Sequence, residues 1–209
     1  MIQTHNLSFQ YPQNPEALRF PDLLLEREDN LLILGKSGIG KTTLLHLLAG
    51  LLQPKTGTVN LENVALHSLS AKKRDRFVGR HIGLVFQKNY AIRSLDVMQN
   101  LEARLFFAGL KSKRERLHDL LDQLDLAAHK NKKIHQLSEG QLQRLGIALA
   151  VVHQPQMILA DEPTSSLDDE NCEVVMQLLL KQAEQQNANL LVITHDARVK
   201  PLFQNQITL

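Results

Sequence analysis

The segment that most limits the fold is GKSGIGKT, residues 35–42, which joins an apolar run to a helical pattern through three glycines. The run before it, NLLILG at 30–35, is typical of a buried parallel strand. The pattern after it, KTTLLHLLAGLL at 41–52, predicts a helix that stops at Gly50. The spacing G-x-x-x-x-G-K-[ST] is that of a P-loop, whose glycines let backbone N–H groups close around phosphate oxygens. A strand, a phosphate loop and a helix in this order predict an α/β fold.

The P-loop also carries two side chains that a simple turn would not need. Lys41 is expected to neutralise the β and γ phosphates of a nucleotide, and Thr42 to offer its hydroxyl to Mg²⁺. A glycine turn that merely preceded a helix would require neither residue. The predicted nucleotide-binding residues of this segment are Gly35, Lys36, Ser37, Gly38, Ile39, Gly40, Lys41, Thr42 and Thr43.

A second motif, MILADE at 157–162, is an apolar strand that ends in two carboxylates. In open α/β sheets, ligands bind at the carboxyl ends of the strands. Because side chains alternate along a strand, Asp161 and Glu162 are expected on opposite sides, with Asp161 holding Mg²⁺ and Glu162 orienting or deprotonating the attacking water. A pair of acids capping a helix is the alternative interpretation. Beside a P-loop, the pair favours phosphoryl transfer to water.

Apolar runs at 81–87, 156–163 and 189–196 predict further core strands with helices between them, hence a mainly parallel sheet. Residues 88–136 hold no clear strand and are expected to form a helical insert. Four leucines in this insert share one helix face by their spacing: Leu117, Leu120, Leu121 and Leu124. Ser112 and Glu115 are predicted to form a capping box in front of that helix.

Composition excludes several classes of protein. The 209 residues carry a net charge of +2, which does not indicate a nucleic-acid-binding surface, and the basic clusters at 72–76, 111–116 and 130–133 are interpreted as solvated faces. Cys172 is the sole cysteine, which suits a reducing compartment. The N-terminus lacks the pattern of a secretory signal, and no apolar run approaches the roughly 20 residues that span a bilayer. A role at a membrane would therefore depend on a partner.

Five further features follow in order along the chain. Tyr11 lies well before the P-loop, and Gln87 ends the strand-like run at 81–87. LSEGQ at 137–141 opens a helical pattern, SSLD at 165–168 follows the two acids, and ITHD at 193–196 contains His195. Together with the P-loop and MILADE, this ordered set resembles the ATP-binding subunit of ABC transporters over almost the whole chain.

The resemblance implies a fold and a reaction. The fold would be an α/β P-loop NTPase core with a mainly parallel sheet, a helical signature subdomain and a small N-terminal β region. One domain, 1–209, would comprise an ATP-binding core at 1–87 and 137–209 and a helical insert at about 88–136. The activity would be ATP hydrolysis, with ATP and Mg²⁺ as ligands.

The resemblance also assigns residues. In this family the signature of one subunit faces the P-loop of a second copy, head to tail around two ATP molecules. A helix opening at Ser138 has the free N–H groups and dipole to bind the γ-phosphate held by a neighbour's Lys41. The residues implied in this contact are Ser138, Glu139, Gly140 and Gln141, with Asp168 in the D-loop. The implied catalytic residues are Glu162, His195 and Gln87, and the implied metal site consists of Thr42, Gln87 and Asp161.

Two of these assignments have alternatives in which the residue has no functional role. His195 is singled out among nine histidines by its LLVITHD setting, and an ordinary surface histidine is the alternative. Tyr11 is expected to stack on adenine, although it and the nearby Phe9 are also candidates for core packing. The chain departs from the family pattern at Leu149, where an arginine is usual, and at Asn30, where a glycine is usual. Neither position touches the phosphates, so activity is expected to survive.

The length, the Tyr-Pro pair and RHIGLVFQ resemble the bacterial subgroup of lipoprotein-release, macrolide-efflux and cell-division ATPases. This implies an integral membrane permease subunit as partner, docked on the helical insert near 88–100, and a peripheral location at the cytoplasmic face of the inner membrane. The competing hypothesis is a soluble ABC-type ATPase that acts on DNA or ribosomes. Such relatives usually have a long coiled-coil insert or a second P-loop, and the sequence shows neither. A small-molecule kinase would leave LSEGQ unexplained, and the N-K-x-D motif of a GTPase is missing.

Overall fold

The computed structural model describes residues 1–13, 16–87, 90–165 and 167–209. The strands are β1 Ile2–Phe9, β2 Leu18–Arg19, β3 Leu24–Leu25, β4 Asn30–Leu34, β5 Thr56–Leu61, β6 Val64–Ala65, β7 Ile82–Val85, β8 Met157–Asp161, β9 Asn189–Thr194 and β10 Asn205–Thr208. The α-helices are α1 Lys41–Leu48, α2 Ala71–His81, α3 Val97–Phe107, α4 Arg114–Gln123, α5 Glu139–Val151 and α6 Asp169–Gln185. Short 3₁₀ helices are η1 Leu66–Ser68, η2 Ala127–His129, η3 Ile134–Gln136 and η4 Ala197–Leu202. Lys88, where the helical insert was predicted to begin, and Ser166 of the SSLD motif lie outside the described residues.

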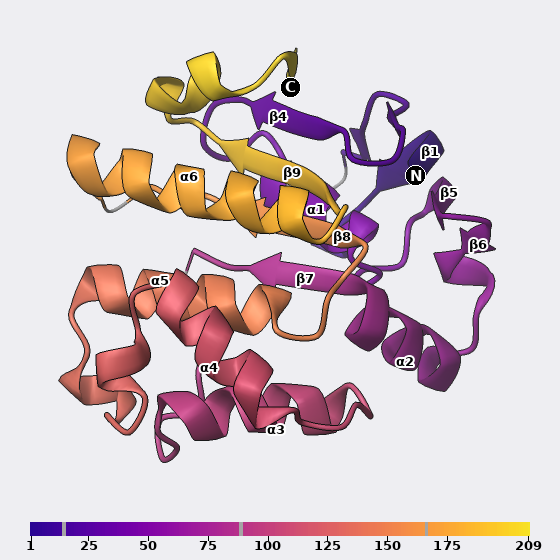
Figure 1. Ribbon diagram of the computed structural model, residues 1–209. Helices are drawn as coiled ribbons and strands as arrows, with labels where there is room; N and C mark the ends of the chain where they lie inside the picture. Colours follow the sequence, from indigo (N-terminus) through magenta and orange to yellow (C-terminus); the bar gives the residue numbers. More distant parts are fainter. Residues whose placement is uncertain (14–15, 88–89, 166) are drawn as a thin grey trace.

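A parallel sheet of order β10-β4-β9-β8-β7 forms the centre of the molecule (Figure 1). This confirms the predicted parallel α/β core and its four predicted strands. The fifth strand, β10, was not predicted because its sequence, NQIT, has no apolar run. It pairs with β4 at the edge of the sheet, where a strand does not need two buried faces.

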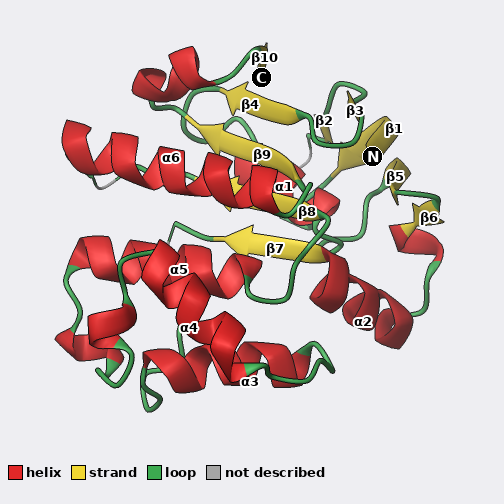
Figure 2. Cartoon of the chain, in the orientation of Figure 1, coloured by secondary structure: helices red, strands yellow, loops and turns green. Residues whose placement is uncertain are grey.

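Helices and a second sheet cover the two faces of the central sheet. Along β4, Leu31 and Ile33 pack toward α1, whereas Leu32 and Leu34 join the core formed with α5 and α6. The alternation explains why the central strands are apolar throughout, since each strand is buried on both sides. Figure 2 shows α6 along the sheet and α3, α4 and α5 grouped below β7.

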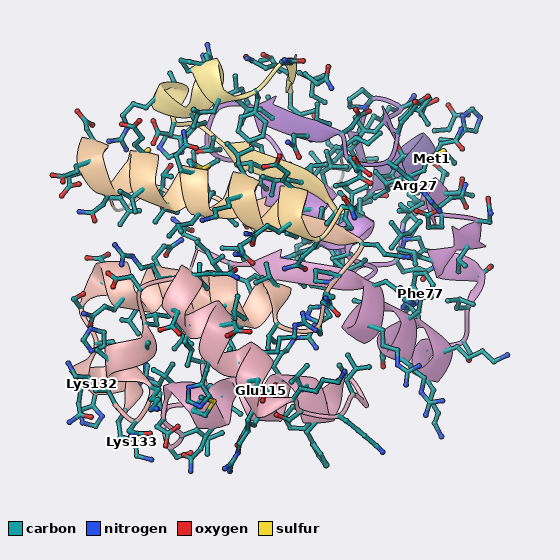
Figure 3. All side chains as sticks on the ribbon, in the orientation of Figure 1. Met1, Arg27, Phe77, Glu115, Lys132 and Lys133 are labelled. Atoms are coloured by element: carbon teal, nitrogen blue, oxygen red, sulfur yellow. The ribbon has the colours of Figure 1, made fainter. Side chains whose placement is uncertain are left out.

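The N-terminal strands form the expected small β region. β1 pairs antiparallel with β2, β3 and β5, and β6 continues from β5. Glu62, in the turn between β5 and β6, accepts from the Met1 ammonium at 2.8 Å and from Arg27 at 3.1 Å. Met1 and Arg27 lie close together in Figure 3.

Residues 90–136 contain α3, α4, η2 and η3. The four leucines predicted to share a face are buried there, as expected. The predicted capping box of Ser112 and Glu115 is wrong: α4 has Lys113 as its N-cap and no side-chain cap, so Ser112 lies one residue too early. A capping box forms instead at the start of α3, between Asp96 and Gln99. Glu115 is exposed, and Figure 3 labels it in the region of α3 and α4.

Two arginines join α2 to α3 reciprocally. Arg104 of α3 donates to the carbonyl of Gly79 at 3.1 Å, near the end of α2. Arg80 of α2 donates to the carbonyl of Ala108 at 3.2 Å, just after α3. Each guanidinium therefore satisfies carbonyls at the end of the other helix, where a cation also interacts favourably with the helix dipole.

The apolar segment LGIALAVV begins in α5 and ends at its C-cap, Val152, and its core-facing residues are buried. Within the four described ranges, every helix is too short or too polar to cross a membrane.

Candidate functional site

The P-loop connects β4 to α1 at the carboxyl edge of the central sheet. Gly38 has φ +84° and Gly40 has φ +105°, a left-handed backbone that favours glycine. A Cβ at Gly40 would also approach the Leu18 side chain at 3.1 Å. Residues 36–39 are exposed, so the loop is open to a ligand.

The first turn of α1 is suited to an anion. Its N-cap is Gly40, which supplies no side-chain acceptor, and no acidic residue lies in the first turn. The first N–H groups of a helix have no partner within the helix and lie at the positive end of its dipole. A phosphate is a natural acceptor for these groups.

Lys41 is folded back over the loop. Its ammonium donates to the carbonyls of Gly35 at 2.8 Å and Lys36 at 3.1 Å, and lies 3.4 Å from a Glu162 oxygen. Only 6% of the residue is exposed. The P-loop thus holds a nearly buried ammonium next to one carboxylate. The positive charge of this ammonium is what a bound phosphate chain would need.

Asp161 and Thr42 form the second contact between the motifs. The Thr42 hydroxyl donates to Asp161 Oδ1 at 3.3 Å. Burial raises the pKa of Asp161, the Thr42 hydrogen bond opposes that shift, and the neighbouring Glu162 charge adds to it. A bound cation would stabilise the ionised form.

Glu162 lies just beyond the strand, which ends at Asp161. Its φ of +48° turns the chain, so both carboxylates reach P-loop residues. The expectation that they lie on opposite sides assumed that the strand continued through Glu162, whereas β8 ends at Asp161. The two carboxylates still have different partners.

The Glu162 carboxylate is held in place by residues at the end of β9. It accepts from the Thr194 hydroxyl at 2.7 Å and from the His195 backbone N–H at 3.3 Å, and the His195 ring Nδ1 lies 3.0 Å from both its oxygens. Burial raises the pKa of Glu162, but the hydrogen bonds from His195 and Thr194 outweigh burial and leave this pKa below its usual value. Thr194, which is fully buried, was not predicted. Its only sequence signal was a hydroxyl residue ending an apolar strand.

Gln87 and the D-loop approach each other. Gln87 Nε2 donates to the Ser165 hydroxyl at 3.4 Å. Asp168 is the N-cap of α6 and accepts from the Asn171 N–H at 2.8 Å. Gln87 was predicted to bind the metal, whereas its contact in this structure is with Ser165 of the D-loop.

The signature forms the start of α5. Ser138 is the N-cap, and its hydroxyl accepts from the Gln141 N–H at 3.3 Å while the Gln141 side chain accepts from the Ser138 N–H at 3.0 Å. One of the N–H groups expected to be free is therefore paired within the helix. Ser138 and Glu139 are exposed. A Cβ on Gly140 would lie 3.8 Å from the Asn171 side chain, so the signature lies next to the first turn of α6.

Tyr11 lies against the P-loop helix. Its hydroxyl is 2.8 Å from Thr43 Oγ1, and its ring packs edge-on against Phe9 at 4.8 Å. Tyr11 is 41% exposed, whereas Phe9 packs on the core. Of the two aromatics, Tyr11 is the more exposed.

The fold and these contacts define a P-loop nucleotide-binding protein with a carboxylate placed for hydrolysis. The family model described as "ABC transporter" matches residues 19–165. The chain belongs to the ABC transporter family, as an ATP-binding cassette ATPase.

Three relatives illustrate the similarity. The lipoprotein-releasing system ATP-binding protein LolD of Legionella pneumophila (strain Lens) is 37% identical over 186 residues, which cover 88% of this chain and 82% of that protein. The cassette MJ0796, solved as a dimer in a post-hydrolysis state bound to ADP and Pi, has a TM-score of 0.89 at 32% identity and covers 100% of this chain and 94% of its own. CbiO1 from Clostridium perfringens, part of the ABC transporter complex cbiONQ, has a TM-score of 0.87 at 27% identity, with coverages of 99% and 83%.

Proposed function

We propose that the chain is the motor subunit of a transporter or mechanotransmission complex, and that it hydrolyses ATP between two head-to-tail copies. The observation that carries the proposal is the position of Glu162, held by Thr194 and His195 and facing Lys41 beside an uncapped helix start. A fixed carboxylate next to a phosphate site can orient a water for attack.

The other residues of the site have matching roles. The phosphates are bound by the N–H groups of the P-loop and by Lys41, whose ammonium leaves its carbonyl partners for them, and Tyr11 supports the adenine. Thr42, Asp161 and Gln87 would hold Mg²⁺. Among the described residues no cluster of three or more His, Cys, Asp or Glu side chains is arranged for a metal, which fits an ion that takes one carboxylate and completes its shell from phosphates and water. When bound, Mg²⁺ neutralises charge that develops on the phosphates.

The second copy completes the site. Among the described residues, the signature contacts His129 and the start of α6. Its exposed Ser138 is therefore available to the nucleotide of a partner. ATP would hold the dimer closed by satisfying donors on both copies, and hydrolysis would release it.

A membrane subunit is the proposed partner, and a groove of about 430 Å³ is its proposed docking site. The groove lies between α2, α3 and α5, and its apolar lining includes Val78, Ile92, Phe107 and Leu149. Leu149 is the position where the family usually has an arginine, and here it adds to the apolar lining. Phe107 is 74% exposed, and a partner seated in the groove would cover it. A short apolar helix of the membrane subunit fits this lining.

This assignment divides the chain in the way the sequence suggests. Residues 1–87 and 137–209 would form the ATP-binding core, and residues 88–136 the helical insert that carries the partner's motion to the signature. The protein would lie on the cytoplasmic face of a bacterial inner membrane, attached through the membrane subunit.

The variant Glu162→Gln tests the proposed hydrolysis. It should bind ATP, hydrolyse it very slowly and accumulate as an ATP-held dimer in size-exclusion chromatography. Glu170→Gln, an exposed acid in the first turn of α6, is the matched control and should behave as the wild type. A Glu162→Gln variant that hydrolyses ATP at the wild-type rate would show that Glu162 does not act on the water.

Two adjacent phenylalanines test the docking site. Phe107 lines the groove, whereas Phe106, 76% exposed, does not. In a pull-down from detergent extract, Phe107→Asp should lose a multi-spanning membrane protein that the wild type and Phe106→Asp retain. Equal retention by both variants would place the partner elsewhere.

A further inference from the structure

Arg198 connects two loops of the proposed site. Its guanidinium donates from Nε and NH2 to the Asp196 carboxylate at 2.9 and 2.7 Å, and from NH2 to the Leu167 carbonyl at 3.2 Å. Leu167 belongs to the D-loop, and Asp196 directly follows His195. The same guanidinium also pairs with the exposed Asp169.

The Asp196 carboxylate is largely buried and has several hydrogen-bond partners. Its side chain is 10% exposed and also accepts from the Thr164 hydroxyl at 2.9 Å. The Arg198 hydrogen bonds, opposed by burial, hold the pKa of Asp196 well below its usual range, so the carboxylate stays charged. A two-donor guanidinium contact fixes both position and orientation of such a carboxylate.

A chain of hydrogen bonds runs from this pair to Glu162. The Asp196 backbone N–H donates to the Thr194 hydroxyl at 3.0 Å, and that hydroxyl donates to Glu162 Oε2 at 2.7 Å. The Asp196 backbone N–H therefore orients the Thr194 hydroxyl that holds the Glu162 carboxylate. The D-loop carbonyl, Arg198, Asp196, Thr194 and Glu162 form one connected network.

We propose that Arg198 is a positioning residue that fixes the D-loop to the loop of His195, so that the position of the D-loop sets the position of the Glu162 carboxylate. The inference rests on the proposed function, in which Glu162 acts on the water and Asp168 of the D-loop meets the second copy. Through this network, a contact made by the partner at the D-loop reaches the hydrolytic carboxylate.

A simpler interpretation treats Arg198 as one end of a surface ion pair, which contributes little. The two interpretations can be separated because Arg198 has two kinds of partner. Asp169→Asn removes the exposed pair and leaves the contacts to Asp196 and Leu167. Arg198→Met removes all of them and keeps an unbranched side chain of similar length.

The experiment measures kcat and KM for ATP, together with thermal unfolding, for the full chain and its variants. Arg198→Met should lower kcat about tenfold, because small displacements of a catalytic group are costly, and should change KM less than about twofold, because the P-loop is untouched. Arg198→Lys should recover part of the rate, since one ammonium cannot reproduce the fork. Asp169→Asn should stay within about twofold of the wild type.

A double-mutant cycle tests the path through Thr194. If Arg198 acts through this hydroxyl, Arg198→Met should have little further effect on kcat in a Thr194→Val background. Additive effects, or an Arg198→Met variant with the kcat of Asp169→Asn, would overturn the inference. A loss of kcat in Arg198→Met that is explained entirely by the fraction of unfolded protein at the assay temperature would also overturn the inference. Glu162→Gln, run in parallel, distinguishes the failures: a normal rate there refutes the proposed function, whereas a slow Glu162→Gln beside a normal Arg198→Met refutes the inference alone.

Discussion

His153, between α5 and β8, should make the protein less stable as the pH falls below neutral. The residue is 5% exposed, and its Nε2 lies 3.1 Å from both the Ile82 carbonyl and the Arg104 guanidinium. Burial, followed by the charge of Arg104, lowers the pKa of His153 from 6.5 to about 3. The Ile82 carbonyl opposes this shift, and the charges of Arg116 and His81 add to it.

The size of the effect follows from linkage. Between these two pKa values the unfolded chain binds a proton that the folded chain does not, so acid favours unfolding and stability rises with pH. From the shift of His153 from 6.5 to about 3, this residue costs about 2 kcal/mol of unfolding free energy between pH 7 and pH 5. The loss continues down to the folded-state pKa and is small above pH 7.

The assay is urea unfolding of the wild type and of His153→Gln at pH 7, 6 and 5. Glutamine has a donor for the Ile82 carbonyl and an acceptor for Arg104 but does not titrate. The variant should lose about 2 kcal/mol less than the wild type between pH 7 and pH 5. Parallel curves for the wild type and His153→Gln would refute the argument.

Three further predictions concern the nucleotide site and the helical insert. Lys41→Ala should weaken ATP binding roughly 10- to 100-fold in calorimetry, because it removes charge-assisted hydrogen bonds, and unchanged affinity would remove the P-loop assignment. Ser138→Arg should leave ATP binding by the single chain intact and prevent the dimer that Glu162→Gln forms, as seen by size-exclusion chromatography. A dimer that persists in the Ser138→Arg, Glu162→Gln double variant would contradict the contact in trans. Asp96→Ala should cost about 1 kcal/mol in urea unfolding by removing the cap of α3, and no loss of stability would show that the cap is dispensable.

Local patterns were sufficient to predict much of the fold. The glycine spacing at 35–42 and the apolar runs beside it predicted β4, the loop and α1, including the helix end at Gly50, which has φ +67°. The leucines of α4 were predicted because helical period depends on neighbours a few residues apart. β10 was not predicted because an edge strand needs little apolar signal in its sequence. The start of α4 was misplaced because the helix begins after Lys113 and not after Ser112.

The sequence by itself determined the chemistry of the site: a phosphate loop, a lysine, two carboxylates after a strand and a serine-led helix, all carried by short-range spacing. Only the tertiary structure decided how these groups meet. The left-handed turn at Glu162, the Thr194 and His195 contacts that hold its carboxylate, and the Arg198 link to the D-loop join residues far apart in the chain. No local pattern encodes such contacts, because they depend on strand register in the parallel sheet, which aligns Asp161 with Ile193 and so brings Glu162 beside Thr194 and His195.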